Sequence, residues 1–359
     1  MTKPAVLAVV LITAVLILTC RSGPEPAEPE PQPGIFSNVL SPEAEELVRL
    51  GISYHDRADY ETAIDYYTKA LDLAPDHPVI LYEMAFSYMY MGNSETALAV
   101  AEQGIAAAEQ RGMRDVIPSL FDIKGSALDN LDRSVEAVEV YLTAINQYGA
   151  SNTLLYYNLG LSYYRIEKRA EAREALRQGL LLNPNHPSSN LLLGRISMEE
   201  GQKTQAFYAF CYFLLLEPNT DRAAQTYNTL LHLLAKQEQI GIMDNGTFTA
   251  SDMVISLSFV LDDENAGKSD AEKTQAKLYY LLTSLEELKN SGKIERRAGD
   301  ELYWDFYAPF FYRIAVSGYF GVFCRYIALS SDPGADDWII NGREEIEGFF
   351  EWLNEAPGE

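Results

Sequence analysis

The sequence is poor in cysteine and histidine and short of positive charge. Among 359 residues there are three Cys and four His, and 28 Lys and Arg face 52 Asp and Glu, which gives a net charge of −24. Cys20, Cys211 and Cys324 lie far apart, so they match no zinc or redox motif and no disulfide framework; a bond between the last two stays open. An acidic surface repels phosphates, so nucleic acid is not an expected partner.

Motifs for catalysis and phosphate binding are also missing. The sequence has no Gly-x-Ser-x-Gly elbow and no His-Glu-x-x-His helix. The segment AGKS at 266–269 ends like a phosphate-binding loop, but Asp262 occupies the place of its first glycine. Lys273 stands where a calcium loop beginning at Asp262 would need its closing Glu. We therefore predict no catalytic residue, no metal site, no cofactor and a non-enzymatic function.

The N-terminal segment has the plan of an export signal. Lys3 precedes a run, residues 5–18, that is apolar at every position but one. The run is shorter than the roughly 20 residues that span a bilayer, and Thr19-Cys20 follows it directly. This ending resembles the lipobox of bacterial lipoproteins, in the looser form of spirochaetes. The resemblance implies that residues 1–20 are a signal peptide and that Cys20 is acylated; the alternative is an uncleaved transmembrane anchor.

Residues 21–42 are expected to be a tether rather than part of a folded domain. The sequence GPEPAEPEPQPG at 23–34 alternates proline with acidic and small residues, a composition that favours extended polyproline II. The protein is thus expected in the bacterial cell envelope, lipid-anchored and facing the periplasm. Arg21 does not match the Asp-based inner-membrane retention signal of enteric bacteria, which favours the outer membrane.

The middle of the chain repeats with a period of 34 residues. In residues 44–77, Gly51 and Tyr54 are followed by Ala63, Tyr67 and a closing proline. This order of small and aromatic residues resembles the tetratricopeptide repeat (TPR), a pair of helices that crosses closely at its small residues. Within residues 44–236 we expect about five repeats and a capping helix, at 44–77, 78–111, 118–151, 153–186, 187–220 and 221–236.

The resemblance implies an all-α fold in which helical hairpins stack into a solenoid, because no repeat buries its apolar face alone. Residues 237–359 lose the repeat and are expected to form an aromatic-rich helical C-terminal domain. Its helices are predicted at 252–261, 270–290, 298–314, 316–330 and 342–354, after a small hairpin at 240–250. The aromatic residues of 303–326 are expected to form a core that packs against the last repeat; the alternative is an exposed partner surface.

TPR arrays are similar to one another in binding partners on a concave face lined by first helices. The positions that project there form the predicted partner-binding groove: Tyr82, Phe86, Met89, Tyr90, Tyr157, Leu161, Tyr164, Arg165, Leu191, Arg195 and Met198. The third repeat contributes Asp122, Ser126, Asp129 and Asn130. Aromatic residues and Met are enriched at protein interfaces. The alternative is that these residues pack on neighbouring repeats or beneath the C-terminal region.

The groove lacks the Lys/Asn/Arg clamp by which chaperone-binding TPRs hold a C-terminal carboxylate. Val48 and Ile52 stand in the first repeat, and Val79 and Glu83 in the second. A cytosolic co-chaperone function is therefore not expected.

Three functions are compatible with these features. The favoured one is a membrane-anchored scaffold that binds envelope proteins and has no chemistry of its own. The second is an accessory lipoprotein of a solute transport system that binds a periplasmic partner or a small ligand, which an aromatic-lined aperture near Tyr82, Tyr157 and Tyr312 would support. The third is an unfamiliar enzyme in the C-terminal third, which a pocket pairing a carboxylate with a histidine would support.

Overall fold

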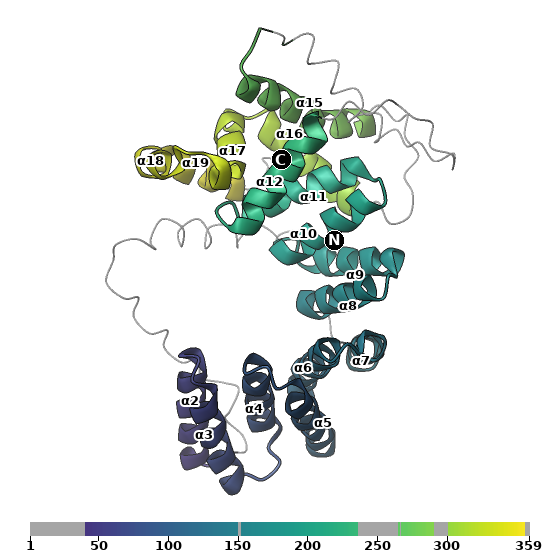
Figure 1. Ribbon diagram of the computed structural model, residues 1–359, viewed down its shortest axis with the longest axis vertical. Helices are drawn as coiled ribbons and strands as arrows, with labels where there is room; N and C mark the ends of the chain where they lie inside the picture. The colour runs from purple at the N-terminus through teal and green to yellow at the C-terminus, as the bar shows by residue number, and fades with distance from the viewer. Residues whose placement is uncertain (1–39, 150–151, 236–264, 266, 291–300, 356–359) are drawn as a thin grey trace. The chain divides into compact units, whose positions relative to one another are not determined.

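The computed structural model describes residues 40–149, 152–235, 265, 267–290 and 301–355, and the regular structure in these ranges is entirely helical (Figure 1). The predicted all-α fold is therefore confirmed. Several predictions lie outside the described residues: the signal peptide with Cys20, nearly all of the tether, the hairpin at 240–250 and the helix at 252–261.

Each expected repeat holds two helices. The helices are α2 (Pro42–Asp56) and α3 (Tyr60–Leu73), α4 (Pro78–Tyr90) and α5 (Ser94–Arg111), α6 (Ile117–Asn130) and α7 (Ser134–Tyr148), α8 (Thr153–Arg165) and α9 (Arg169–Leu182), and α10 (Pro187–Glu199) and α11 (Lys203–Leu216). A short 3₁₀-helix, Arg114–Val116, precedes α6, and α12 (Asp221–Ala235) follows the last pair at the expected place of the cap.

The turn inside every repeat places one residue at positive φ. The equivalent residues are Ala58 (60°), Gly92 (81°), Asp132 (58°), Glu167 (62°) and Gly201 (74°). The next amide bonds back to a carbonyl of the last helical turn, as from Asp59 N to Tyr54 O at 3.0 Å, which satisfies a carbonyl that the helix end leaves open. The turn is thus a fixed part of the repeat, and three repeats adopt it with a side chain that disfavours this conformation.

Glycine on the first helix accommodates an aromatic ring from the second. A Cβ on Gly51, Gly125 or Gly194 would lie 2.4 Å from an atom of the ring of Tyr67, Tyr141 or Phe210, respectively. These rings are buried. The predicted close crossing of the two helices therefore has a specific cause: the ring occupies the space of the missing side chain.

The described residues form two compact units, which divide within α9, between Ala175 and Leu176. From α2 to α8 each helix contacts the next along the chain, and the first helices α2, α4, α6 and α8 also contact one another in sequence (Figure 1). These first helices therefore present one continuous face.

The second unit joins the fifth helix pair and α12 to the C-terminal helices. These are α15 (Asp270–Asn290), a π-helix (Leu302–Tyr307), α16 (Ala308–Ala315), α17 (Phe320–Ile327), a 3₁₀-helix (Leu329–Ser331), α18 (Ala335–Asn341) and α19 (Arg343–Asn354). The helix predicted at 270–290 is found with those bounds. The described part of the helix predicted at 298–314 is one uninterrupted helical run, in which the π-helix leads directly into α16. The helix predicted at 316–330 is instead shorter and consists of α17 followed by a 3₁₀ turn.

Helix α11 explains why the fifth repeat shares a unit with the C-terminal helices. Every side chain from Ala206 to Leu216 is buried, and a helix that is apolar on all sides needs cover on all sides. Helices α10, α12 and α17 and the π-helix contact it. The Tyr212 ring lies 5.2 Å from the Phe306 ring and 5.1 Å from the Phe310 ring, centroid to centroid. The aromatic segment therefore forms a core against the last repeat, as predicted.

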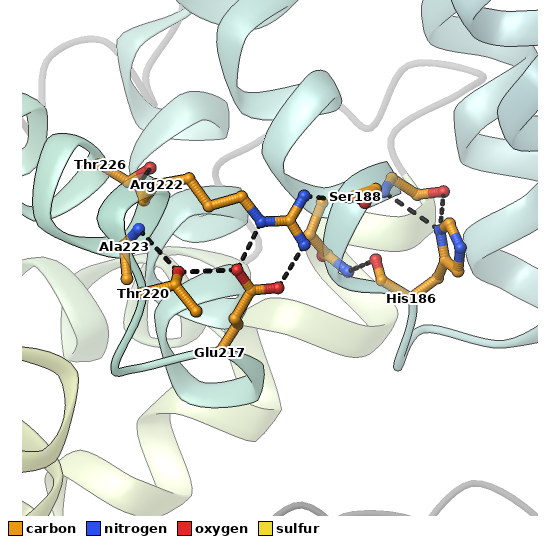
Figure 2. Close-up of polar contacts among 9 residues, drawn as sticks. His186, Ser188, Glu217, Thr220, Arg222, Ala223 and Thr226 are labelled. Atoms are coloured by element: carbon orange, nitrogen blue, oxygen red, sulfur yellow. Dashed lines mark hydrogen bonds and ion pairs between the residues drawn. The ribbon is translucent and has the colours of Figure 1, made fainter. Parts of the chain in front are cut away.

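A polar network joins the turn after α11 to the start of α10 (Figure 2). The guanidinium of Arg222 donates two hydrogen bonds to the carboxylate of Glu217 and a third, of 3.0 Å, to Ser188 Oγ. Thr220 Oγ1 donates to Glu217 and accepts from Ala223 N, which caps α12. This bidentate pair fixes the corner between two helices of the fifth repeat and its cap.

Cys211 and Cys324 are free thiols in this unit, so the structure contains no bond between them. Burial raises the pKa of both, that of Cys324 to about 12. Within the described parts of the chain, no helix combines the length and the apolar character that crossing a bilayer requires.

Candidate partner-binding face

The first-helix face of the first unit carries most of the predicted groove residues. We define it by α2, α4, α6 and α8, which contact one another in order. Its two halves differ in chemistry: a cluster of aromatic rings in mutual contact lies in the first two repeats, and a network of hydrogen-bonded polar side chains lies in the third and fourth.

The aromatic cluster consists of five side chains of the first two repeats: His55, Tyr60, Tyr82, Phe86 and Tyr90. The His55 ring stacks on Phe86 with centroids 4.9 Å apart and meets the edges of Tyr60 and Tyr90 at 5.1 and 5.2 Å. Phe86 also contacts Tyr90 at 4.8 Å and stacks with Tyr82 at 6.0 Å. Tyr90 remains 59% exposed. The cluster thus presents aromatic surface to solvent, as protein-binding sites do.

One polar contact recurs between successive first helices. Nδ1 of His55 lies 2.8 Å from Ser87 Oγ, and Ser162 Oγ donates to Asp129 Oδ2 at 2.5 Å. His55 and Asp129 occupy the same position of repeats one and three, and the two serines share a position in the repeats that follow. The register between first helices is therefore fixed by polar side chains at the face as well as by apolar packing.

The third and fourth repeats use their face residues on each other. Asn158 Nδ2 donates to Asp122 Oδ1 at 2.6 Å, and Arg165 forms an ion pair of 3.3 Å with Asp129, which is 8% exposed. Ser126 and Tyr141 hydroxyls lie 3.1 Å apart. A cleft of about 820 Å³ adjoins this network, lined by Asp129, Asn130, Asp132, Arg133, Ser134, Val135, Glu136, Arg165 and Ile166. Asp122, Asp129, Asn158 and Arg165 thus hold the two repeats together.

Glu83 has no such partner. It is half-buried on α4, and no ion pair or hydrogen bond joins its side chain to the part of the chain that the structure describes. Burial, reinforced by the negative charge of Asp56, raises the pKa of Glu83 to about 7. Burial likewise raises the pKa of Asp122 to about 6, although its bond from Asn158 acts the other way. The face therefore holds two carboxylates whose charge the protein compensates incompletely.

The hydroxyl of Tyr67 is buried and makes no hydrogen bond of ordinary geometry, although Ser87 on α4 lies within reach to act as its partner. Tyr67 corresponds to Tyr141 of the third repeat, and both rings pass over a first-helix glycine. Since the Tyr141 hydroxyl reaches Ser126 on the face, the Tyr67 hydroxyl comes to the equivalent point of the first repeat. Burial and then the charge of Glu83 raise the pKa of Tyr67, and a side-chain interaction with Ser87 lowers it.

The remaining predicted groove residues differ in accessibility. Tyr157, Leu161 and Tyr164 are half-buried on α8, and Met89 is half-buried on α4. In the second unit Arg195 is exposed and Met198 half-buried on α10, whereas Leu191 is only 6% exposed. Leu191 therefore has little surface to offer a partner.

Three important residues of the face were not among the predicted groove residues: His55, Glu83 and Tyr67. His55 occupies one of the repeat positions that line the face, so counting positions from the start of the first repeat could have identified it. Tyr67 lies on a second helix and reaches the face only because Gly51 lets its ring through. No cluster of three or more His, Cys, Asp or Glu side chains that could hold a metal ion occurs among the described residues.

Comparison with protein families identifies the repeats. Residues 44–77 and 153–186 each match a model described as tetratricopeptide repeat. These ranges coincide with the first and fourth repeats expected from the sequence, and each holds a helix pair. The chain therefore contains TPRs, and TPR proteins bind peptide or protein partners.

Individual proteins resemble parts of the chain. The DnaJ homolog subfamily C member 7 of Mus musculus is 35% identical over 63 residues, which is 18% of this chain and 13% of the mouse protein. The solved structure of PilF from Pseudomonas aeruginosa has 19% identity and a TM-score of 0.48, covering 65% of this chain and 95% of PilF. MamA from Desulfovibrio magneticus RS-1, from residue 41 to its end, has 20% identity and a TM-score of 0.42, covering 51% and 99%.

Proposed function

We propose that this protein is a non-enzymatic TPR scaffold, held at a bacterial envelope membrane by an acyl group on Cys20, that binds a partner protein on the first-helix face of repeats one and two. The observation that carries the binding site is the aromatic cluster around His55. Its five rings contact one another, and Tyr90 at its edge is 59% exposed. Aromatic side chains fixed by their neighbours bury much area at little cost in conformational entropy.

Two further observations support this half of the face over the other. The polar face residues of repeats three and four are engaged in contacts between helices, such as Asn158 with Asp122 and Arg165 with Asp129. The solute-transport alternative calls for an aromatic-lined aperture, whereas the cleft in repeats three and four is lined mainly by charged and polar side chains. A protein ligand on the aromatic cluster is therefore the better-supported function.

Photo-crosslinking from the cluster tests the proposal. The full chain would carry benzoylphenylalanine in place of Tyr90, and the control would carry it in place of Tyr279, which is 45% exposed on α15 in the other unit. We expect position 90 to crosslink one or a few proteins in the cells of origin, identified by mass spectrometry, and position 279 not to capture them. Equal capture from both positions, or none from position 90 under conditions where the crosslinker reacts, would show that the site is elsewhere.

A further inference from the structure

We propose that the aromatic cluster and Glu83 together bind a lysine or arginine side chain carried by an exposed segment of the partner protein. The inference rests on the proposed function and adds the chemistry of the occupant. It follows from a charge that the protein leaves uncompensated and a set of aromatic rings, both on the same face of two repeats.

The charge balance of the first two repeats is strongly negative. Residues 44–111 carry twelve Asp and Glu against four Lys and Arg. All four cations are engaged away from Glu83: Arg49 with Glu46, Arg57 over the Tyr54 ring, Lys69 with Asp65 and Arg111 with the Pro75 carbonyl. A ligand that brings a positive charge to Glu83 would therefore supply the cationic partner that the first two repeats do not provide.

The position of Glu83 favours a strong hydrogen bond to a bound cation. Its carboxylate is half-buried, and a hydrogen bond from a charged donor to a partly desolvated carboxylate is stronger than one at an open surface. No ion pair or hydrogen bond from the described residues engages this carboxylate. Glu83 is thus a polar group whose bonding is incomplete within the described part of the protein.

The aromatic cluster supplies the second part of the site. Glu83, Ser87 and Tyr90 follow one another along the same side of α4, one helical turn apart, and Ser87 contacts His55 within the cluster. A cation held over aromatic faces is attracted by their quadrupoles, and Lys and Arg also bury their apolar stems along such surface. Lysine and arginine fit both the carboxylate and the rings, whereas an acidic or purely apolar segment would satisfy only the rings.

Peptide selection tests the chemistry even while the partner is unidentified. A random dodecapeptide library displayed on phage would be selected on the immobilised full chain at physiological salt. Enriched peptides would then be synthesised with each Lys replaced by norleucine and each Arg by citrulline, and their affinities measured by fluorescence anisotropy. We expect enriched sequences to contain Lys or Arg, and loss of the critical cation to weaken binding by about tenfold.

Single substitutions test which residues of the protein bind the basic peptides. Glu83→Gln keeps the size of the side chain and should weaken the basic peptides about tenfold, and Tyr90→Ala should weaken them several-fold. Glu139→Gln, an exposed carboxylate on the second helix α7, removes the same charge away from the face and should leave affinity unchanged. Circular dichroism spectra that match those of the unsubstituted protein would show that each variant is folded.

The outcomes separate this inference from the proposed function. Enrichment of neutral or acidic peptides that Tyr90→Ala weakens and Glu83→Gln does not would overturn the lysine or arginine ligand but leave the face as a binding site. Basic peptides equally weakened by Glu83→Gln and Glu139→Gln would indicate attraction by net charge alone and would also overturn it. Failure to enrich any peptide, together with no crosslink from position 90, would reject the proposed function itself.

Discussion

The ring of Tyr67 occupies the space that a side chain on Gly51 would need, since its Cε1 lies 2.4 Å from the position of a Cβ there. The same relationship joins Tyr141 to Gly125. Because both rings are fully buried, neither can swing away without opening the core of its repeat.

We therefore expect Gly51→Ala to destabilise the protein by about 1–3 kcal/mol, the usual cost of forcing extra volume into a packed core. Urea denaturation followed by circular dichroism measures it. Gly318→Ala is the matched control, because no atom lies within 4 Å of a Cβ at that position. A Gly51→Ala loss no larger than that of the control would mean that the ring accommodates the methyl group easily.

The sequence predicts the repeat well because each of its elements is local. Small residues, aromatic residues and closing prolines at fixed spacing specify where both helices begin and end, and the expected ranges 44–77 and 153–186 agree with the family models. The π-helical geometry of the first turns of the helix predicted at 298–314 was not predicted. Pro309 has no N–H to continue the hydrogen-bond ladder, yet it could equally have begun a helix, so the sequence alone does not reveal the π-helix before it.

The face is less predictable than the fold. Counting positions correctly identifies Tyr82, Phe86 and Tyr90 as neighbours, because they share one side of a helix. It does not reveal that Asp129 and Arg165 pair with each other, since that depends on the register between helices of different repeats. Nor does it reveal Tyr67, which reaches the face from a second helix. Contacts between repeats must be seen in three dimensions.

The repeated left-handed turn gives a second prediction. Ala58 adopts a φ of 60° where Gly92 and Gly201 stand in two other repeats. Glycine enters this region without the steric cost that alanine meets. Ala58→Gly is therefore expected to stabilise the protein by roughly 0.5–1 kcal/mol.

The reverse change at the equivalent turn is its control. Gly92→Ala should destabilise the protein by a similar amount, because a Cβ at Gly92 meets no atom within 4 Å and the backbone conformation alone is at issue. Thermal unfolding of both variants measures the two changes in stability. Shifts of the same sign in the two variants would contradict the strain argument.

The link between repeats three and four should depend on Asp129 far more than on Arg165. Asp129 is buried and accepts a hydrogen bond from Ser162, whereas Arg165 is exposed. We expect Arg165→Ala to cost about 0–1 kcal/mol, as exposed ion pairs do. Asp129→Ala should cost about 2–3 kcal/mol, since it leaves the buried Ser162 hydroxyl without this acceptor and empties a packed position. Urea denaturation measures both, and equal losses would mean that the exposed ion pair dominates.

The proposed acyl anchor is tested at Cys20. Cells that express the protein would be given radiolabelled palmitate, and the label on the immunoprecipitated chain would be measured. We expect label on the unsubstituted protein and on Cys324→Ala, and none on Cys20→Ala, because the proposed acyl groups attach at residue 20. Absence of label from all three would favour the alternative of an uncleaved N-terminal anchor.

The raised pKa of Glu83 makes stability depend on pH. The folded protein holds the proton of this carboxyl up to a pH of about 7, whereas a model carboxyl of this type loses it near 4.5. Between these values the folded state binds more protons than the unfolded state, so the contribution of Glu83 to stability falls as pH rises. Asp56 of α2 is the charged group of a neighbouring helix that adds to the shift.

Removing the charge should therefore stabilise the protein at high pH alone. We expect Glu83→Gln to raise the free energy of unfolding by roughly 1–3 kcal/mol at pH 8, and to change it little at pH 4.5, where both side chains are neutral in the folded state. Urea denaturation across this range measures the difference, with Glu139→Gln as the exposed control. A basic peptide bound to the face should reduce the advantage of Glu83→Gln at pH 8, because the ligand then stabilises the charged carboxylate. A difference that does not vary with pH would show that Glu83 titrates as an ordinary surface carboxyl.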